Sequence, residues 1–225
     1  MAISGWRSII SFLFLCLFTK RFPVFIVKKD LEVKLVTDIK ATANLLLGGI
    51  FYALTLVTFV IATRLTTAAN AILLQYTNSI YIIAFGPLLL KEKNSFIDYA
   101  VVAGLILGMV LLVGGGLNAD SLTGIIFAVI SGCVYGFTTI FLRRQKNSDP
   151  LESLKLSNLL CFFTCLPSMI KAGVPDGKSA LFLLILGVFQ IGLASVLFAR
   201  GVKGVPALNS YIFSVYRLFL LIKSG

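Results

Sequence analysis

The stretch Ala68–Lys93, AANAILLQYTNSIYIIAFGPLLLKEK, decides the fold of this chain. It is mostly apolar, and as a helix it is long enough to cross the hydrocarbon core of a bilayer, which is about 30 Å thick. The stretch ends abruptly at the charged KEK. It also places six polar side chains where no water is present, namely Asn70, Gln75, Tyr76, Thr77, Asn78 and Tyr81.

Further apolar runs of similar length lie on both sides of this segment. The 225-residue chain is 58% hydrophobic and has a mean hydropathy of +0.99, whereas soluble domains are about 45–50% apolar. The runs are continuous rather than alternating, which favours membrane-spanning helices over the strands of an outer-membrane barrel. We therefore expect an all-α, multi-pass (polytopic) membrane protein with eight transmembrane helices: 1–18, 39–62, 66–90, 96–117, 121–143, 151–170, 179–202 and 205–222.

The net charge of +11 is distributed unevenly along the chain. Fourteen of the 20 Lys and Arg residues fall at alternate connections between the runs, around 19–38, 91–95, 144–150 and 200–204. This is the positive-inside pattern of membrane proteins, so it predicts that these four loops are cytoplasmic and that KEK is a cytoplasmic helix end. It also argues against a nucleic-acid partner. The remaining cations are assigned to the opposite side: Arg7, Arg64, Lys171, Lys178, Arg217 and Lys223.

Residues with catalytic or metal-binding chemistry are scarce. The chain has no His, and its four cysteines lie within apolar runs, where they are interpreted as small packing residues: Cys16, Cys133, Cys161 and Cys165. The acidic residues lie at loops or helix ends rather than deep in a run, so no proton relay of the usual kind is visible. We expect no metal and no cofactor, and the chain is not predicted to be an enzyme.

The chain contains an internal repeat. When the sequence is shifted by 139 positions, LLLGGIFYALTLVTF (45–59) aligns with LILGVFQIGLASVLF (184–198), and the alignment continues through Ala68/Ala207 and Asn70/Asn209. The second run then pairs with the seventh and the third with the eighth. Because this offset is an odd number of helices, the two copies face opposite ways in the membrane, as in many secondary transporters.

The repeat predicts two inverted five-helix halves of which eight helices are present. The first half, 1–118, is expected to lack its first helix, and the second half, 119–225, is expected to lack its last. A shortened or frameshifted reading frame would account for both absences.

The polar residues inside the runs have two interpretations. On one continuous helix, Asn70, Thr77, Asn78 and Tyr81 fall within an arc of about 100°, whereas Gln75 and Tyr76 point elsewhere. Such a face either makes hydrogen bonds between helices or lines a substrate path. The same two interpretations apply to the other intramembrane candidates: Tyr52, Tyr135, Asn158, Gln190, Asn209 and Tyr216.

Small residues spaced by four mark close helix packing. They occur at Ala100, Gly104 and Gly108, and again at Gly132 and Gly136. Packing within one chain is favoured, and a homodimer remains an open alternative.

Several of these motifs resemble one family. TTAANAILLQYT-N-S-IY (66–81) followed by LLKE (89–92) is similar to the signature of the drug/metabolite transporter (DMT) superfamily, in particular its EamA-type permeases. GWRSIISF (5–12), SGCVYGFTTIFLRRQK (131–146), LSNLLCFFTCLP (156–167) and ARGVKGVPALNS (199–210) extend the resemblance over nearly the whole chain. The family is built from two inverted five-helix halves.

The departures from the family concern two sites. Where the family has a proline after the Tyr-Thr pair, this chain has Ser79. Where the family has a Glu-Pro pair on its ninth helix, this chain has Arg217 and Leu218. The second departure reinforces the expectation of a damaged or shortened permease gene.

The leading interpretation is a permease that moves a small metabolite or drug across the cytoplasmic membrane of a bacterium by alternating access. Its partners would be the lipid bilayer and a small-molecule substrate. The alternatives are a non-transporting truncated remnant or membrane helper, and a membrane-embedded enzyme. The enzyme is disfavoured because no convergent carboxylates or histidines are visible.

Overall fold

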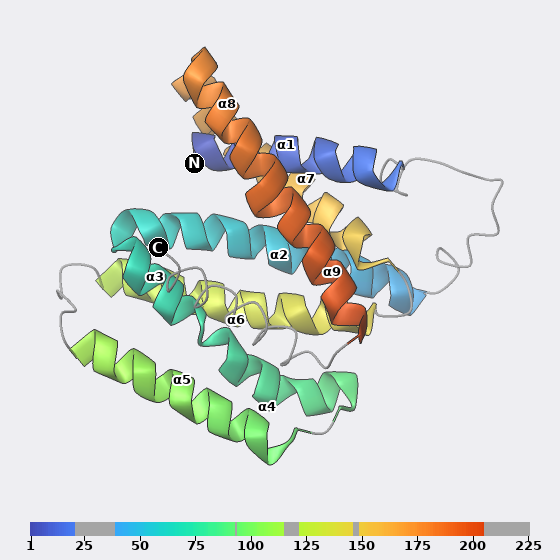
Figure 1. Cartoon of the computed structure of the whole chain (residues 1–225), viewed down its shortest axis with the longest axis vertical. Helices are drawn as coiled ribbons and strands as arrows, with labels where there is room; N and C mark the ends of the chain where they lie inside the picture. The colour runs from blue at the N-terminus through green and yellow to red at the C-terminus, as the bar shows by residue number, and fades with distance from the viewer. Residues whose placement is uncertain (21–38, 93, 115–121, 146–148, 205–225) are drawn as a thin grey trace.

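The computed structural model describes residues 1–20, 39–92, 94–114, 122–145 and 149–204. In this part of the chain every regular element is helical (Figure 1). The elements are α1 (Ala2–Thr19), α2 (Ile39–Leu65), α3 (Ala68–Gln75), α4 (Asn78–Leu90), α5 (Phe96–Gly114), α6 (Leu122–Arg144), α7 (Pro150–Ala172), α8 (Gly177–Ile185), the π-helix η2 (Leu186–Leu193) and α9 (Ala194–Gly204).

The described helices have the length and composition of membrane spans. Six of them, counting α3–α4 and α8–η2–α9 as one span each, are long and apolar enough to cross a bilayer, and α5 contributes the shorter apolar stretch Phe96–Gly108. Large apolar side chains such as Leu17 and Leu88 are about three-quarters exposed, as expected for side chains that face lipid. The polytopic all-α fold is therefore confirmed. The predicted eighth span, 205–222, lies outside the described residues.

Local sequence explains where helices begin and end. Asp149 caps the start of α7 by accepting a hydrogen bond from the Leu151 backbone amide at 3.2 Å. Pro150 follows at the first helical position, where its fixed φ favours the helix. The far end of α7 stops at Gly173, whose φ of +74° is favoured for glycine.

The ends of α1, α4, α6 and α9 lie with the starts of α2 and α7 at one end of the bundle, on the right of Figure 1. Lys155 of α7 donates a hydrogen bond to Thr19 at the end of α1 (3.3 Å). Arg143 at the end of α6 forms an ion pair with Glu92 after α4 (2.8 Å). The Arg143 side chain also donates to the Lys203 carbonyl at the end of α9 (3.1 Å). We call this region the common end.

The four connections that the charge pattern assigns to one side of the membrane all adjoin the common end. The spacing of charges therefore predicted a real feature of the tertiary structure, because a loop must leave the bundle at the end where its helices stop. That this end faces the cytoplasm stays a prediction.

The fold is an inverted repeat. The span α2 starts at the common end, whereas its repeat partner α8–η2–α9 ends there, so the two run in opposite directions (Figure 1). Repeat-related glycines make equivalent close contacts: a Cβ at Gly48 of α2 would lie 3.2 Å from the Ser153 hydroxyl of α7, and one at Gly187 of η2 would lie 2.6 Å from Ile10 of α1.

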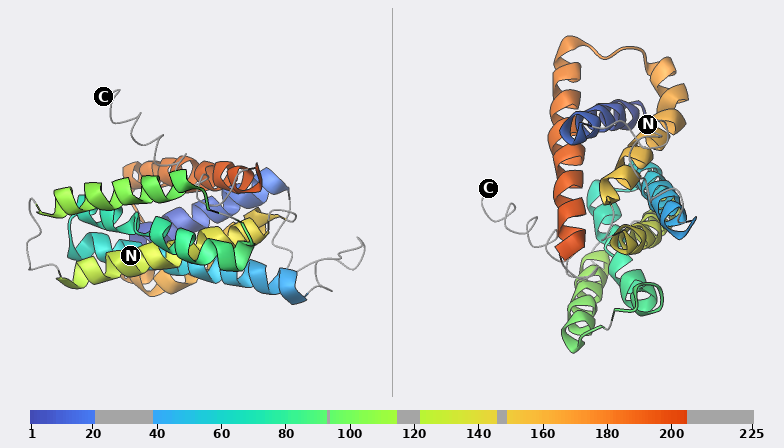
Figure 2. Two further views of the ribbon diagram at one scale, coloured as in Figure 1. Left: turned by 90° about the horizontal axis from the view of Figure 1, so that it is seen from below. Right: turned by 90° about the vertical axis from the view of Figure 1, so that its right-hand side faces the viewer.

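Two sets of helices pack around α2. On one side α6 lies along α2 and also contacts α3 and α4, while α5 lies at the outer edge. On the other side α7 contacts both α2 and α1, and α8–η2–α9 crosses α1 (Figure 2). The second set and α2 surround the buried polar residues described below.

The predicted third span is wrong in one respect, because it is not one continuous helix. It breaks at Tyr76–Thr77, where the backbone amides of Tyr76, Thr77, Ser79 and Ile80 bond to carbonyls three residues earlier. The Thr77 hydroxyl also donates to the Leu74 carbonyl at 2.8 Å. Tight i→i−3 bonding of this kind interrupts an α-helix without a proline. The break is therefore present although Ser79 replaces the family's proline.

The glycine predictions divide. Gly132 and Gly136 do pack within the chain, since an added Cβ would meet the Thr77 hydroxyl at 2.3 Å and the Asn78 carbonyl oxygen at 2.9 Å. In contrast, a Cβ at Gly104 or Gly108 would meet nothing within 4 Å in the structure. The described helices therefore do not make the close packing expected along the Ala100–Gly108 stripe, and that packing stays a prediction.

Gly124 provides a test of this packing. A Cβ at this position would lie 2.7 Å from the backbone carbon of Leu65, and backbone cannot rotate away as a side chain can. We expect Gly124→Ala to destabilise the protein by about 1–3 kcal/mol, as overpacking usually does. Unfolding in detergent micelles measures this. The matched control, Gly104→Ala on exposed α5, should be neutral or stabilising, and equal losses in both variants would contradict the packing.

Candidate functional site

A compact apolar cluster lies just inside the common end. It consists of Leu15, Leu142, Leu154, Val196, Ala199 and Val202, all at most 2% exposed. These residues come from α1, α6, α7 and α9, with Tyr52 and Phe198 packed against them. We call this cluster the apolar plug.

A layer of buried polar side chains adjoins the plug on the side away from the common end, and its Ser195 directly precedes Val196 of the plug. Ser11 is four residues before Leu15, Asn158 is four residues after Leu154, and Ser195 is four residues before Ala199. Since α1 and α9 end at the common end and α7 begins there, all three steps lead in the same direction. We call Ser11, Asn158, Ser195 and the adjoining Tyr52 the polar layer.

The polar layer contains side-chain atoms without hydrogen-bond partners in the described structure. These are Ser11 Oγ and Asn158 Oδ1, both fully enclosed, whereas the Ser195 hydroxyl lies beside the Tyr52 hydroxyl. Asn158 uses its other group, Nδ2, to donate to the Leu154 carbonyl at 2.8 Å. Leaving a buried polar atom unpaired costs about 1–3 kcal/mol, so two such atoms in one place mark a site where another molecule can supply partners.

Arg7 lies one further turn along α1 from Ser11. Its Nη1 donates a hydrogen bond to Oε1 of Gln190 on η2 at 2.9 Å. Its Nε is buried and has no partner in the described structure. The guanidinium lies within electrostatic range of the Tyr52 hydroxyl and the Cys161 thiol. It is therefore a cation inside a membrane span, held beside the polar layer by a neutral amide.

The π-helix η2 fixes the position of Gln190. Gly187 and Gly192 bring η2 close to α1, because a Cβ at either position would come within 2.6 Å of Ile10 or Phe14. π-Helical segments within α-helices occur frequently at functional sites. Here the segment places an exposed glutamine beside Arg7.

A second chain of polar contacts joins the broken span to α6 and α2. Gln75 Nε2 donates to the Ser131 hydroxyl at 3.0 Å, and that hydroxyl donates to the Thr55 carbonyl at 3.4 Å. These bonds have partners within the protein, so they fix α3 against α6. Gln75, which was predicted to point away from the polar face, is thus a structural residue.

The structure brings together only part of the predicted site. Tyr52 and Asn158 lie in the polar layer, and Gln190 contacts Arg7 beside it. Tyr135 stacks on Phe198 of α9 with ring centroids 6.4 Å apart and lies within electrostatic range of Tyr52. Asn209 and Tyr216 lie outside the described residues.

The predicted face of Asn70, Thr77, Asn78 and Tyr81 is interrupted by the helix break, which separates Asn70 from the other three, and those three lie toward α6. Asn70 bonds locally at the end of the bundle opposite the common end: its backbone amide donates to the capping Thr67 hydroxyl at 3.2 Å, and its Nδ2 donates to the Thr66 hydroxyl at 3.5 Å. Thr77 bonds back to Leu74. Asn78 is buried against α6 with an unpaired Nδ2, and the Tyr81 Cβ packs over Gly136. Of these four residues, only Asn78 has a buried side-chain atom without a hydrogen-bond partner in the described structure, as residues of the polar layer do.

Sequence reasoning missed Arg7, Ser11 and Ser195. Arg7 was assigned to the outer side by the charge pattern alone, although it lies within the predicted first span. The spacing of Arg7 and Ser11 by four on an apolar helix was a signal that could have identified one polar face.

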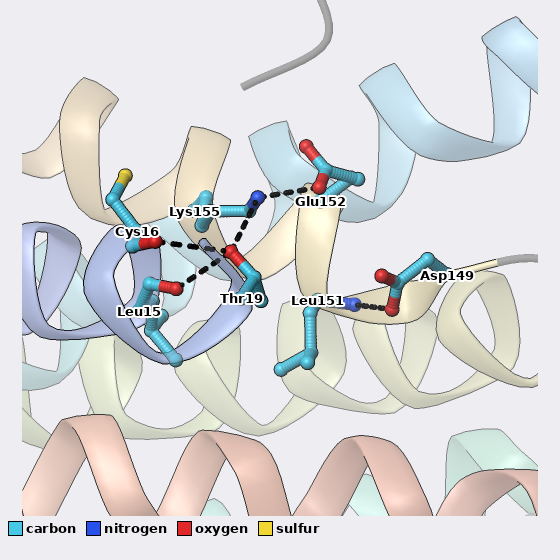
Figure 3. A network of polar contacts seen from close by, with 7 residues as sticks. All are labelled: Leu15, Cys16, Thr19, Asp149, Leu151, Glu152 and Lys155. Carbon is cyan, nitrogen blue, oxygen red and sulfur yellow. Dashed lines mark hydrogen bonds and ion pairs between the residues drawn. The ribbon is translucent and has the colours of Figure 1, made fainter. Parts of the chain in front are cut away.

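Buried charges close the common end outside the plug. Lys155 is fully buried and forms an ion pair with Glu152, and Thr19 accepts a bond from the same ammonium (Figure 3). Gln145 donates to the Asn44 carbonyl at 3.0 Å and accepts from Ser153 at 2.9 Å. Together with the Arg143–Glu92 pair, these contacts tie α1, α2, α4, α6, α7 and α9 together.

The comparisons with known proteins agree with the resemblance. A sequence model of the EamA-like transporter family matches the chain twice, over residues 1–114 and 122–222. No curated protein and no solved structure matches the chain. In the described residues no group of three or more His, Cys, Asp or Glu side chains could hold a metal ion.

Proposed function

Because this chain belongs to the EamA-like transporter family of the DMT superfamily, we propose that it is a permease that moves a small metabolite or drug by alternating access. The observation that carries the proposal is the polar layer beside Arg7. It lies within the membrane spans, and its unpaired atoms are enclosed between helices of both inverted halves. Transporters with inverted repeats place their substrate sites at such an interface near the membrane midplane.

The arrangement at the common end supports a closed state on that side. A solute in the polar layer would have to pass the apolar plug and then the buried ion pairs to leave there. Alternating access requires these two layers to part as one half rocks against the other. Ion pairs and packed apolar side chains suit this role because such contacts are either formed or separated, with no stable arrangement in between.

We place the protein in the cytoplasmic membrane of a bacterium, with the common end in the cytoplasm. The positive-inside distribution of the loops supports the orientation. The polar layer would then be closed toward the cytoplasm in the state described here.

Flux through sealed vesicles tests the proposal. The full chain is reconstituted, and counterflow of labelled phenethylamine, phenylalanine and phenylacetate is measured against vesicles without protein. These probes share an aromatic body and differ in charge. We expect at least one to exchange faster than in empty vesicles, and absence of exchange for all three would count against a permease of such solutes.

Cys161 gives a second readout that does not depend on the substrate. It lies three residues beyond Asn158 and is 1% exposed. Alternating access predicts that a membrane-impermeant thiol reagent modifies Cys161 in both right-side-out and inverted vesicles, with Cys161→Ser as the control. Modification from one side only, without flux, would favour a non-transporting membrane helper.

A further inference from the structure

Arg7 differs from the buried cations Arg143 and Lys155, and its own side chain is only partly buried. Arg143 has Glu92 as its acidic partner, and Lys155 has Glu152. Arg7 forms no ion pair in the described part of the chain, and its Nη1 donates to the neutral Gln190. A charge within a membrane span is costly unless it is paired, so such residues mark binding sites or ion pathways.

We propose that Arg7 binds the carboxylate of a small monocarboxylate substrate with an apolar body. This assignment rests on the proposed function and specifies the chemical class of its substrate. The planar guanidinium presents parallel N–H donors that match a carboxylate in geometry and charge. The bond to Gln190 uses one N–H donor of Arg7, and the Nε donor has no partner in the described structure. The described side chains therefore do not satisfy all the donors of Arg7.

The neighbouring side chains favour a monoanion. Ser11 lies on the same face of α1, one turn from Arg7, so their side chains are about 5–6 Å apart at Cβ. A carboxylate held by Arg7 can therefore accept a second hydrogen bond from the unpaired Ser11 hydroxyl. The site offers one cation, and a dianion such as phosphate would leave a negative charge without a partner among the described side chains.

The surroundings favour an apolar body on the same molecule. Phe14 and Phe198 pack against the plug, and the Tyr135 ring stacks on Phe198. Gln190 is exposed, so the Arg7–Gln190 contact lies at the edge of the packed region of the described helices. Phe14 lies two turns from Arg7 on the same face of α1, close to Gly192 of η2, so a ligand with its carboxylate on Arg7 would direct its apolar group along α1 toward this ring.

Equilibrium binding of labelled phenylacetate to the full chain in lipid nanodiscs tests the proposal. Phenylacetamide has the same shape and no charge, so it serves as the matched competitor. We expect unlabelled phenylacetate to displace the label at least about tenfold more effectively than the amide, because hydrogen bonds to a charged group contribute more than neutral ones. Equal competition, or no binding of phenylacetate, would overturn the proposal.

Substitutions then assign the effect to Arg7. Arg7→Gln should weaken phenylacetate binding at least about tenfold, and Arg7→Lys, which keeps the charge but loses the planar fork, should give an intermediate affinity. Arg200→Gln is the matched control, since Arg200 is exposed and lies over the Phe18 ring at 5.7 Å. If Arg7→Gln binds phenylacetate as the wild type does, Arg7 serves only as an anchor near the membrane surface, and the proposal fails.

The design separates this inference from the proposed permease. If Arg7→Gln does not fold, two measurements still test the carboxylate site. They are the competition of phenylacetate and phenylacetamide in the wild type, and the affinity of Arg7→Lys for phenylacetate. Flux of phenethylamine or phenylalanine that survives in Arg7→Gln, with no preference for the acid, would retain the permease and remove the carboxylate site. Arg7-dependent binding of phenylacetate without flux of any probe would retain the site and remove the permease.

Discussion

Glu152→Gln is expected to destabilise the protein by about 3–5 kcal/mol, because it removes the acidic partner of a buried ammonium. Lys155 has no exposed side-chain surface, and Glu152 is 8% exposed. The Lys155 ammonium keeps its bond to Thr19 in this variant, but a hydroxyl does not neutralise a charge. The cost should therefore be that of breaking a buried ion pair. Reversible unfolding in mixed micelles measures it.

A double-mutant cycle shows whether the charge itself is the cause. Lys155→Met removes the ammonium that pairs with the buried Glu152 carboxylate, so it should also be costly. The double variant Glu152→Gln/Lys155→Met removes both charges and should recover much of the loss, because replacing a whole buried pair is often close to neutral. Additive losses in the double variant would show that packing rather than charge compensation dominates here.

Asp149→Asn is the matched control for the same helix end. It also changes a carboxylate to an amide, but Asp149 is exposed and asparagine caps helices about as well as aspartate. We expect its stability to remain within about 0.5 kcal/mol of the wild type. A loss as large as that of Glu152→Gln would mean that the start of α7 tolerates no change, whatever the burial of the charge.

The sequence predicted the features that depend on local composition and on distances along the chain. Hydropathy located the described spans, because each must match the thickness of the bilayer. The charges of the loops predicted which helix ends lie together, and the alignment of Gly48 with Gly187 predicted two halves of opposite direction. Each of these follows from a rule that acts on one segment at a time.

The candidate site could be predicted only in part, because it depends on contacts between segments. Asn158 was recognised as an intramembrane amide, but its unpaired oxygen reflects the packing of α7 against α1. At Tyr76–Thr77 the backbone forms i→i−3 hydrogen bonds in place of the α-helical i→i−4 bonds. Because no proline stands there, the sequence gives no sign of this break. The positive-inside pattern, which concerns loops, assigned Arg7 to the side of the membrane opposite the cytoplasm. Nothing in its own segment shows that Gln190 lies beside it.

The second large effect is expected at Arg143, which ties α9 to the rest of the common end. Its side chain pairs with Glu92 and donates to the carbonyls of Val202 and Lys203. Arg143→Gln removes the ion pair and shortens the reach to those carbonyls. Because hydrogen bonds to charged groups contribute about 1.5–3 kcal/mol, the end of α9 should open about ten- to a hundredfold more often.

Amide hydrogen exchange in micelles measures this opening directly, because exchange follows the population of the open state. In Arg143→Gln the amides of Ala194–Gly204 should exchange at least about tenfold faster, while those of α8, at the opposite end of the same span, stay unchanged. Arg144→Gln is the matched control, since Arg144 is the exposed neighbour of Arg143. Faster exchange in both variants would reflect loss of positive charge at the end of α6, and unchanged exchange in both would mean that the plug alone holds α9. Acceleration confined to Arg143→Gln would identify the ion pair as the contact that must break when the common end opens, as alternating access requires.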